Sequence, residues 1–174
     1  MTNTTGIRAD LVPGPVTVEQ MYNIFPFDNS ISKMQLSGVE VQELFDFSTR
    51  RSSSRGCVSQ IQIAGARVVM NCATQDPNQN FPGVAEQIYI GARNPKVPCQ
   101  TDNDCPDKGV GSCAVEAGVC WLPLDPLASY ELATSNYLAQ GGSGFRVLQR
   151  NTTQFDTQVQ QRDALIDYIS AGQP

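Results

Sequence analysis

Alternation of apolar and polar residues marks the strands that this chain is expected to form. In residues 31–36, Ile31, Lys33 and Gln35 alternate with Ser32, Met34 and Leu36, which puts the two sets on opposite faces of a strand. Residues 87–90 and 130–134 are short runs of the strand type. Residues 6–11 also alternate, which predicts a strand from which Arg8 projects on the polar side. We therefore expect strands at these four places.

The clearest hairpin pattern covers residues 58–71, where two strand-like runs flank Ala64 and Gly65. If these two residues form the turn, Cys57 and Cys72 lie opposite each other across the hairpin. Cysteines in that position are close enough to be cross-linked. We therefore predict a disulfide between Cys57 and Cys72.

Three helices are predicted from capping boxes, in which a Thr or Ser is followed three residues later by Gln or Glu. The boxes begin at Thr17, Ser37 and Thr157. The first helix should end before Pro26, because the residue before a proline avoids the α region. The three helices are expected over about residues 17–23, 37–48 and 157–171.

Apolar residues at helical spacing give two of these helices a buried face. They are Val41, Leu44 and Phe45 in the second helix and Val159, Leu165, Ile166 and Ile169 in the last. Residues 49–55 are polar and basic and should form a mobile loop. Because helices and strands do not alternate as β-α-β units, the predicted fold class is α+β, with packed helices and a mixed, mainly antiparallel sheet.

Four cysteines lie in a segment that lacks the apolar residues needed for a core. They are Cys99, Cys105, Cys113 and Cys120. Cross-links must then give the segment its order, and of the three possible pairings we favour Cys99–Cys113 with Cys105–Cys120. A zinc knuckle is the alternative, although the spacings lack the C-x-x-C pattern. We expect residues 97–121 to be a cysteine-rich insertion within one domain of residues 1–174.

Acidic residues outnumber basic residues, 17 against 12, and the net charge is −5. This balance argues against a nucleic-acid binder held by phosphate contacts. No apolar run approaches the roughly 20 residues that span a bilayer, and the polar start does not have the pattern of a signal peptide. Six cysteines nevertheless indicate an oxidising compartment, so we expect a piece of a longer secreted, periplasmic or cell-surface protein.

The chain contains no histidine. This removes the commonest general base, the commonest zinc ligand and the Ser-His and Cys-His nucleophile pairs. Asp102, Asp104 and Asp107 cluster among the cysteines, but their spacing does not fit the calcium loop of an EF-hand. We therefore expect neither a catalytic residue nor a metal site in this chain.

Two further stretches stand out, and the first of them could form a binding site for a flat ligand. Three of the four residues at 141–144 are glycine, so the backbone can turn sharply and a ligand can approach its N–H groups. Tyr137 stands just before them and offers a ring to stack on. Residues 25–29 (FPFDN) form an aromatic corner. The alternatives are a plain connecting loop for the first stretch and a place in the core for the second.

Four segments, in order along the chain, form a set of motifs. They are residues 3–8 (NTTGIR, similar to N-x-G-G-I-R), 22–29 (YNIFPFDN, similar to P-F-x-N), 34–38 (MQLSG, similar to x-x-L-x-G) and 135–145 (SNYLAQGGSGF, similar to N-[FY]-L-A-x-G-G-D-G-F). With them the chain resembles the C-terminal domain of the secreted 5′-nucleotidases, a family that includes UDP-sugar hydrolases and 2′,3′-cyclic-nucleotide phosphodiesterases. The resemblance covers nearly the whole chain apart from the cysteine-rich segment.

In that family the C-terminal domain binds substrate, and a separate N-terminal metallophosphatase domain holds two divalent metal ions and performs the hydrolysis. The resemblance implies that Phe27 and Tyr137 sandwich a nucleobase, an interaction on the order of 1–3 kcal/mol per stacked base. It also implies that the partners of this chain are a nucleoside or nucleotide and that N-terminal domain. The isolated chain should then have no phosphatase activity.

The resemblance also implies which residues make the polar contacts. Asn3 and Asn29 would hydrogen-bond the base or the ribose. Arg8 would meet the phosphate, because its planar fork can bind two oxygens. The backbone around Gly6 and Gly142 would line the pocket.

Ser143 stands where the family usually has an Asp that holds the ribose hydroxyls. A serine is shorter and uncharged, so its hydrogen bond to a hydroxyl should be weaker. This departure keeps two alternatives open. One is an extracellular protein-interaction module with a decayed nucleotide site, and the other is a relative of the sulfur-oxidation hydrolases. The presence of Phe27, Tyr137, Asn29 and Arg8 favours the nucleotide site.

Overall fold

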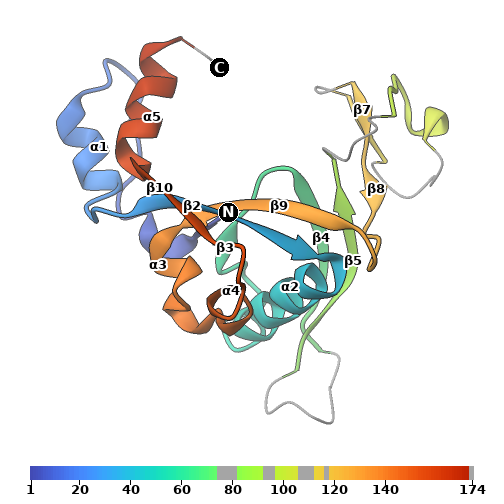
Figure 1. Cartoon of the computed structure of the whole chain (residues 1–174). Helices are drawn as coiled ribbons and strands as arrows, with labels where there is room; N and C mark the ends of the chain where they lie inside the picture. Colours follow the sequence, from blue (N-terminus) through green and yellow to red (C-terminus); the bar gives the residue numbers. More distant parts are fainter. Residues whose placement is uncertain (74–81, 92–96, 106–111, 116–117, 173–174) are drawn as a thin grey trace. The chain divides into compact units, whose positions relative to one another are not determined.

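The computed structural model describes residues 1–73, 82–91, 97–105, 112–115 and 118–172. The chain divides into two compact units (Figure 1). The first contains Met1–Gln35, Gln60–Gln62 and Glu131–Pro174, and the second contains Leu36–Ser59 and Ile63–Tyr130. Whether residues 97–121 are an insertion within a single domain stays a prediction.

The first unit contains a three-stranded sheet in the order β10-β2-β9 and a two-stranded sheet of β1 and β3. The strands are β1 (Thr2–Asn3), β2 (Ser30–Ser37), β3 (Ile61–Gln62), β9 (Ser129–Ser135) and β10 (Phe155–Gln160). The helices are η1 (Thr4–Gly6), α1 (Val18–Ile24), α3 (Asn136–Ala139), η3 (Gly142–Gly144), α4 (Arg146–Gln149) and α5 (Gln161–Ser170). Helices α1 and α5 lie side by side (Figure 1).

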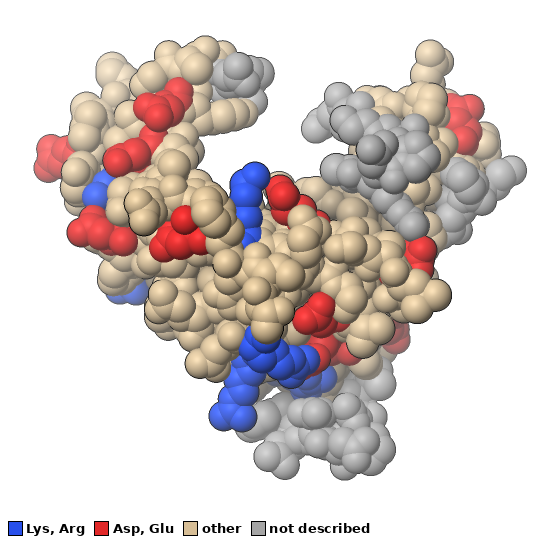
Figure 2. Space-filling view, viewed as in Figure 1, with Lys and Arg blue, Asp and Glu red and all other residues tan. Residues whose placement is uncertain are grey.

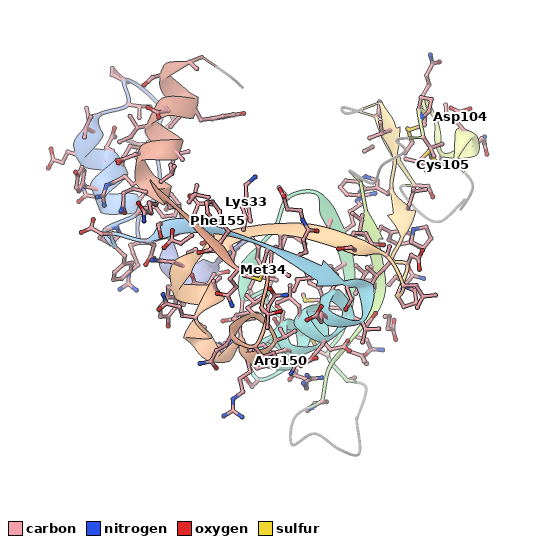
Figure 3. The ribbon with its side chains drawn as sticks, viewed as in Figure 1. Lys33, Met34, Asp104, Cys105, Arg150 and Phe155 are labelled. Carbon is pink, nitrogen blue, oxygen red and sulfur yellow. A yellow bond between two sulfur atoms is a disulfide. The ribbon has the colours of Figure 1, made fainter. Side chains whose placement is uncertain are left out.

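Strand β2 shows the predicted alternation between its two faces. Lys33 is exposed and its Nζ lies 3.3 Å from Oε1 of Glu131 on β9. Met34 projects to the other face and is only 2% exposed (Figure 3). The buried apolar residues of the first unit are Met21, Ile24, Met34, Ile61, Leu138, Ala139, Phe145, Val147 and Leu148.

The second unit is built around helix α2 (Gly38–Ser53), which packs on the sheet β4-β5-β8. Its other elements are β4 (Ala66–Asn71), β5 (Val84–Ile90), η2 (Asp102–Asp104), β6 (Cys113–Ala114), β7 (Val119–Cys120) and β8 (Leu122–Pro123). The expected buried face of α2, Val41, Leu44 and Phe45, is confirmed. The pairings β1–β3, β10–β2, β4–β5, β5–β8 and β6–β7 are antiparallel, which confirms the α+β class.

The first two predicted capping boxes are present. The Thr17 hydroxyl accepts a bond from the Gln20 N–H, and the Gln20 side chain accepts one from the Thr17 N–H. Ser37 and Glu40 form the same reciprocal pair at the start of α2. A box that satisfies two backbone donors is a strong local signal, which explains why both helix starts are predicted correctly.

The predicted start of the last helix is wrong. Residues 157–160 belong to β10, and α5 begins at Gln161. The Thr157 hydroxyl donates to the Ile31 carbonyl oxygen at 2.7 Å, so it is committed to the neighbouring strand β2 and does not cap a helix. Val159, expected on the buried face of this helix, is 47% exposed.

Helix α2 is longer than predicted, because part of the expected mobile loop at 49–55 is helical up to Ser53. The Thr49 hydroxyl donates to the Phe45 carbonyl oxygen, and the Ser52 hydroxyl donates to the Ser48 carbonyl oxygen, each at 2.9 Å. Both side chains are completely buried. Both buried hydroxyls therefore have their hydrogen-bond acceptors within the helix itself. The polar composition of the segment does not reveal these bonds.

Two strand predictions are wrong because the strands have other partners. The expected strand at 6–11 does not form; instead the Arg8 N–H donates to the Ile24 carbonyl oxygen at the end of α1. The expected hairpin at 58–71 does not form either. Strand β3 pairs with β1, while β4 pairs with β5. The strand between residues 87 and 90 is confirmed as part of β5.

Three disulfides are present, and their pairings match the predicted ones. They are Cys57–Cys72, Cys99–Cys113 and Cys105–Cys120. The last four cysteines form a small buried cluster with Val97 and Leu122 packed against it. Because a zinc ligand must be a free thiolate, cysteines joined in this way do not form the alternative zinc knuckle.

An acid-labile contact is located in the loop before η2. The Asp104 carboxylate accepts bonds from the N–H groups of Gln100 at 2.9 Å and Thr101 at 2.8 Å (Figure 3). These two bonds hold the pKa of Asp104 below its usual 3.8. Its contribution to stability is therefore present above the unfolded pKa and is lost as the pH falls through the lower folded pKa.

We expect the melting temperature of the chain to fall as the pH drops below about 4, the usual pKa of an aspartate, partly through this carboxylate. In the Asp104→Asn variant the melting temperature should be lower near neutral pH and should depend less on pH over that acid range. Thermal unfolding followed by circular dichroism at a series of pH values measures both effects. Parallel pH profiles for the two proteins would contradict the assignment.

Among the described residues, no helix is both long and apolar enough to cross a membrane. On the face seen in Figure 2, Lys and Arg side chains stand in small groups among uncharged and acidic residues. The expectation that nucleic acid is not a partner stays a prediction.

Candidate functional site

The first unit contains a cavity of about 290 Å³. Its volume is near the lower end of the roughly 300–1,000 Å³ that is usual for small-molecule sites. It is lined by Asn3, Thr5, Gly6, Arg8, Phe27, Asn29 and Tyr137. These residues come from β1 and η1, from the segment just after η1, from the aromatic corner and from α3. Three of the segments that carry motifs thus meet at one place.

Two aromatic residues at the cavity are about half exposed. Phe27 is 51% exposed and Tyr137 is 46% exposed. The alternative that places Phe27 in the core is therefore wrong. A large apolar ring left in contact with water at a concave surface can bury its face against a ligand, and a flat heterocycle gives the largest contact.

The Tyr137 ring is held in place by the glycine-rich turn that follows it. The Ser143 N–H donates to the Tyr137 hydroxyl oxygen at 3.1 Å. A methyl group at Gly142 would lie only 2.6 Å from two ring carbons of Tyr137 and would also collide with its carbonyl oxygen. Gly142 is therefore required for the close approach of the turn to the ring.

At the other side of the site, Asn3 is buried and held by its neighbours. Its Nδ2 donates to the Thr5 hydroxyl at 2.8 Å. A methyl group at Gly6 would lie 2.8 Å from the Asn3 Oδ1, so Gly6 leaves the space that the amide occupies. The amide thus has a fixed place beside the cavity and can offer hydrogen bonds to a polar ligand edge.

Among the described residues that line this cavity, Arg8 is the only cation. Its side chain is exposed, and its Nη1 donates to the Thr5 carbonyl oxygen at 3.3 Å. Within the described part of the chain, Arg8 makes no ion pair with a carboxylate. The planar guanidinium can therefore bind an anion that enters the cavity without first breaking an ion pair.

The structure brings six of the eight predicted substrate-binding residues to this cavity. They are Asn3, Gly6, Arg8, Phe27, Asn29 and Tyr137. Gly142 and Ser143 do not line it but lie against Tyr137, as described above. Thr5 lines the cavity and was not among the predicted residues, although it lies within the first motif, where the family pattern has a glycine.

The chain belongs to the 5′-nucleotidase C-terminal domain family, whose model matches residues 1–150. An apyrase from Tabanus yao is 26% identical over 174 residues, covering 99% of this chain and 27% of the apyrase. A probable 5′-nucleotidase from Treponema pallidum (strain Nichols) is 23% identical over 173 residues, covering 97% of this chain and 24% of that protein. The chain therefore spans about a quarter of the length of these relatives.

Solved structures agree with the fold. The 5′-nucleotidase precursor from Thermus thermophilus aligns with a TM-score of 0.67 and 23% identity, over 98% of this chain and 28% of that chain. The NAD nucleotidase of Haemophilus influenzae aligns with a TM-score of 0.68 and 20% identity, over 98% of this chain and 26% of that chain. At these identities the likeness establishes the fold alone.

Proposed function

We propose that this chain holds the nucleobase of a nucleotide substrate between Phe27 and Tyr137, as the substrate-binding domain of a 5′-nucleotidase-type hydrolase. The observation that carries the proposal is the cavity itself, where two half-exposed aromatic residues adjoin two amides and one cation. Stacking on aromatic faces tolerates any base, while the amides add selectivity through hydrogen bonds.

The polar residues at the cavity suit the rest of a nucleotide. Asn3 and Asn29 line the cavity and would bond the base or the ribose. Arg8 lines it as well and would bind a phosphate, which its fork can meet with two parallel hydrogen bonds. Ser143 has no place at the cavity lining, so in this proposal it acts on the ligand only through the position of Tyr137.

Hydrolysis would take place elsewhere in the protein. In the described residues, the group of side chains spaced to hold a metal ion consists of cysteines that are joined in disulfides. The chain also lacks histidine. We therefore assign the two divalent metal ions of the proposed reaction to a separate N-terminal domain, where they would activate water. The contribution of this chain is to bind and orient the substrate.

A place outside the cytoplasm fits the three disulfides, which persist in oxidising compartments. One relative, from Macrovipera lebetinus, is a snake venom 5′-nucleotidase, 22% identical over 171 residues, and venom is a secreted fluid. We propose a secreted, periplasmic or cell-surface location for this protein.

Calorimetric titration with adenosine and with AMP tests the proposal. We expect both to bind, with AMP bound more tightly because Arg8 meets its phosphate. The Arg8→Gln variant should bind AMP about threefold to tenfold more weakly while binding adenosine normally, as expected when one partly exposed ionic hydrogen bond is lost. The matched control is Arg146→Gln, which removes an exposed arginine of α4 that is not at the cavity.

Absence of binding to both ligands would overturn the proposal. It would favour the alternative, in which the fold serves as a protein-interaction module and its nucleotide site has decayed. The replacement of the family's Asp by Ser143 is consistent with that alternative. Equal affinity for AMP and adenosine in the unaltered chain would remove the role of Arg8 and leave the stacking role standing.

A further inference from the structure

Arg162 is a buried cation outside all the sequence motifs, and it contacts the aromatic corner directly. It is the second residue of α5 and is only 5% exposed. Arginines are rarely buried unless their charge is compensated. Among the described residues the Arg162 Nε has no hydrogen-bond partner, so the side chain is held by the contacts of its two terminal nitrogens and of its planar face. These contacts are the reason to assign it a function.

The guanidinium of Arg162 makes three contacts with residues 22–28. Its Nη1 donates to the Phe25 carbonyl oxygen at 2.8 Å, and its Nη2 donates to the Asp28 carboxylate at 2.8 Å. Its central carbon also lies 3.7 Å from the centre of the Tyr22 ring, a close cation–π contact. A planar fork can make all three contacts at once, whereas the single ammonium of lysine cannot reproduce that geometry.

The residue before Arg162 adds a fourth link. The Gln161 N–H donates to the Asn29 carbonyl oxygen at 2.8 Å. The first turn of α5 therefore holds the aromatic corner at both ends, on either side of Phe27. Because the Phe27 ring is half exposed, packing in the core does not fix it. Its position depends on the backbone that these bonds secure.

We propose that Arg162 is a positioning residue for nucleobase binding, which fastens the aromatic corner to α5 so that Phe27 and Asn29 stay at the cavity. The inference rests on the function proposed above. Arg162 does not line the cavity, so it would act only through the corner. Without it, the corner would occupy the binding position for only a fraction of the time, and the apparent Kd would rise by the inverse of that fraction.

The test compares the adenosine affinity of the unaltered chain with that of Arg162→Met and Arg162→Lys. We expect Arg162→Met to weaken adenosine binding about tenfold, as when the competent state is about one-tenth populated. Arg162→Lys should recover part of the loss, because it keeps the charge near Tyr22 and Asp28. Arg146→Met removes an exposed arginine of the same unit and should bind adenosine normally.

A second variant keeps the test valid if Arg162→Met does not fold. The Asp28 side chain is 82% exposed, so Asp28→Asn should leave the fold intact. It weakens one of the three contacts, and we expect adenosine binding to fall about twofold to threefold, in line with an exposed ionic contact. Circular dichroism of each variant shows whether it is folded, and only the affinities of folded variants are compared.

The outcomes separate the two proposals. If the unaltered chain binds adenosine, Tyr137→Ala removes the binding, and the folded Arg162 and Asp28 variants keep it, the positioning role is wrong and the nucleotide site stands. If the unaltered chain binds neither adenosine nor AMP, the proposed function fails and the positioning role fails with it. A graded loss across Asp28→Asn, Arg162→Lys and Arg162→Met supports both.

Discussion

Replacing Tyr137 with alanine is expected to remove most of the affinity of this chain for adenosine. One of the two accessible rings at the cavity is lost, and a stacked base is worth about 1–3 kcal/mol in single-strand binders. That range corresponds to a Kd about 5 to 150 times higher. Titration calorimetry with adenosine measures the change directly, and Phe27→Ala should have a similar effect.

Tyr168 offers a matched control for this experiment. It is 48% exposed, against 46% for Tyr137, and belongs to the same unit, but it does not line the cavity. Tyr168→Ala should therefore bind adenosine like the unaltered chain. If both tyrosine variants lost the same affinity, the effect would not come from stacking at the cavity, and the proposed site would be wrong.

Replacing Phe145 with alanine is expected to give the largest loss of stability. Phe145 directly follows the glycine-rich turn and is 1% exposed. Truncation of a fully buried phenylalanine costs about 3–5 kcal/mol, because the cavity left behind is only partly filled by relaxation. This is a large part of the roughly 5–15 kcal/mol that holds a domain folded. Urea unfolding followed by circular dichroism measures the free energy of unfolding.

The control is a phenylalanine at the surface of the same unit. Phe155 on β10 is 66% exposed (Figure 3), so Phe155→Ala should change the free energy of unfolding by about 0.5 kcal/mol or less. A loss for Phe145→Ala no larger than that for Phe155→Ala would mean that Phe145 is not the buried anchor of the turn.

Local signals in the sequence predicted two of the three helix starts correctly and strand partners poorly. The capping boxes at Thr17 and Ser37 depend on residues three positions apart, so the sequence contains the whole interaction. Strand pairing depends on which other strands, distant in the sequence, the fold brings alongside. The predicted partners β3 and β4 instead pair with β1 and β5, yet the disulfide inferred from their hairpin is present.

The residues of the candidate site that lie in sequence motifs could be predicted. The residue that supports the site from a distant part of the sequence could not. Tyr137 was singled out by its place before the glycine-rich turn and Phe27 through a resemblance, and both line one cavity. Arg162 could not be found in this way, because its partner Asp28 is 134 residues away in sequence. A lone arginine at the start of a helix has no pattern that distinguishes it from a surface residue.

The separation between Arg162 and the corner also sets an order of events during synthesis. Residues 3–8 and 25–29 leave the ribosome before Tyr137, and α5 emerges after Tyr137. The cavity can therefore gain its full set of supporting contacts only after α5 has been translated. A nascent chain that ends before α5 would carry both stacking rings without the bonds that hold the corner in place.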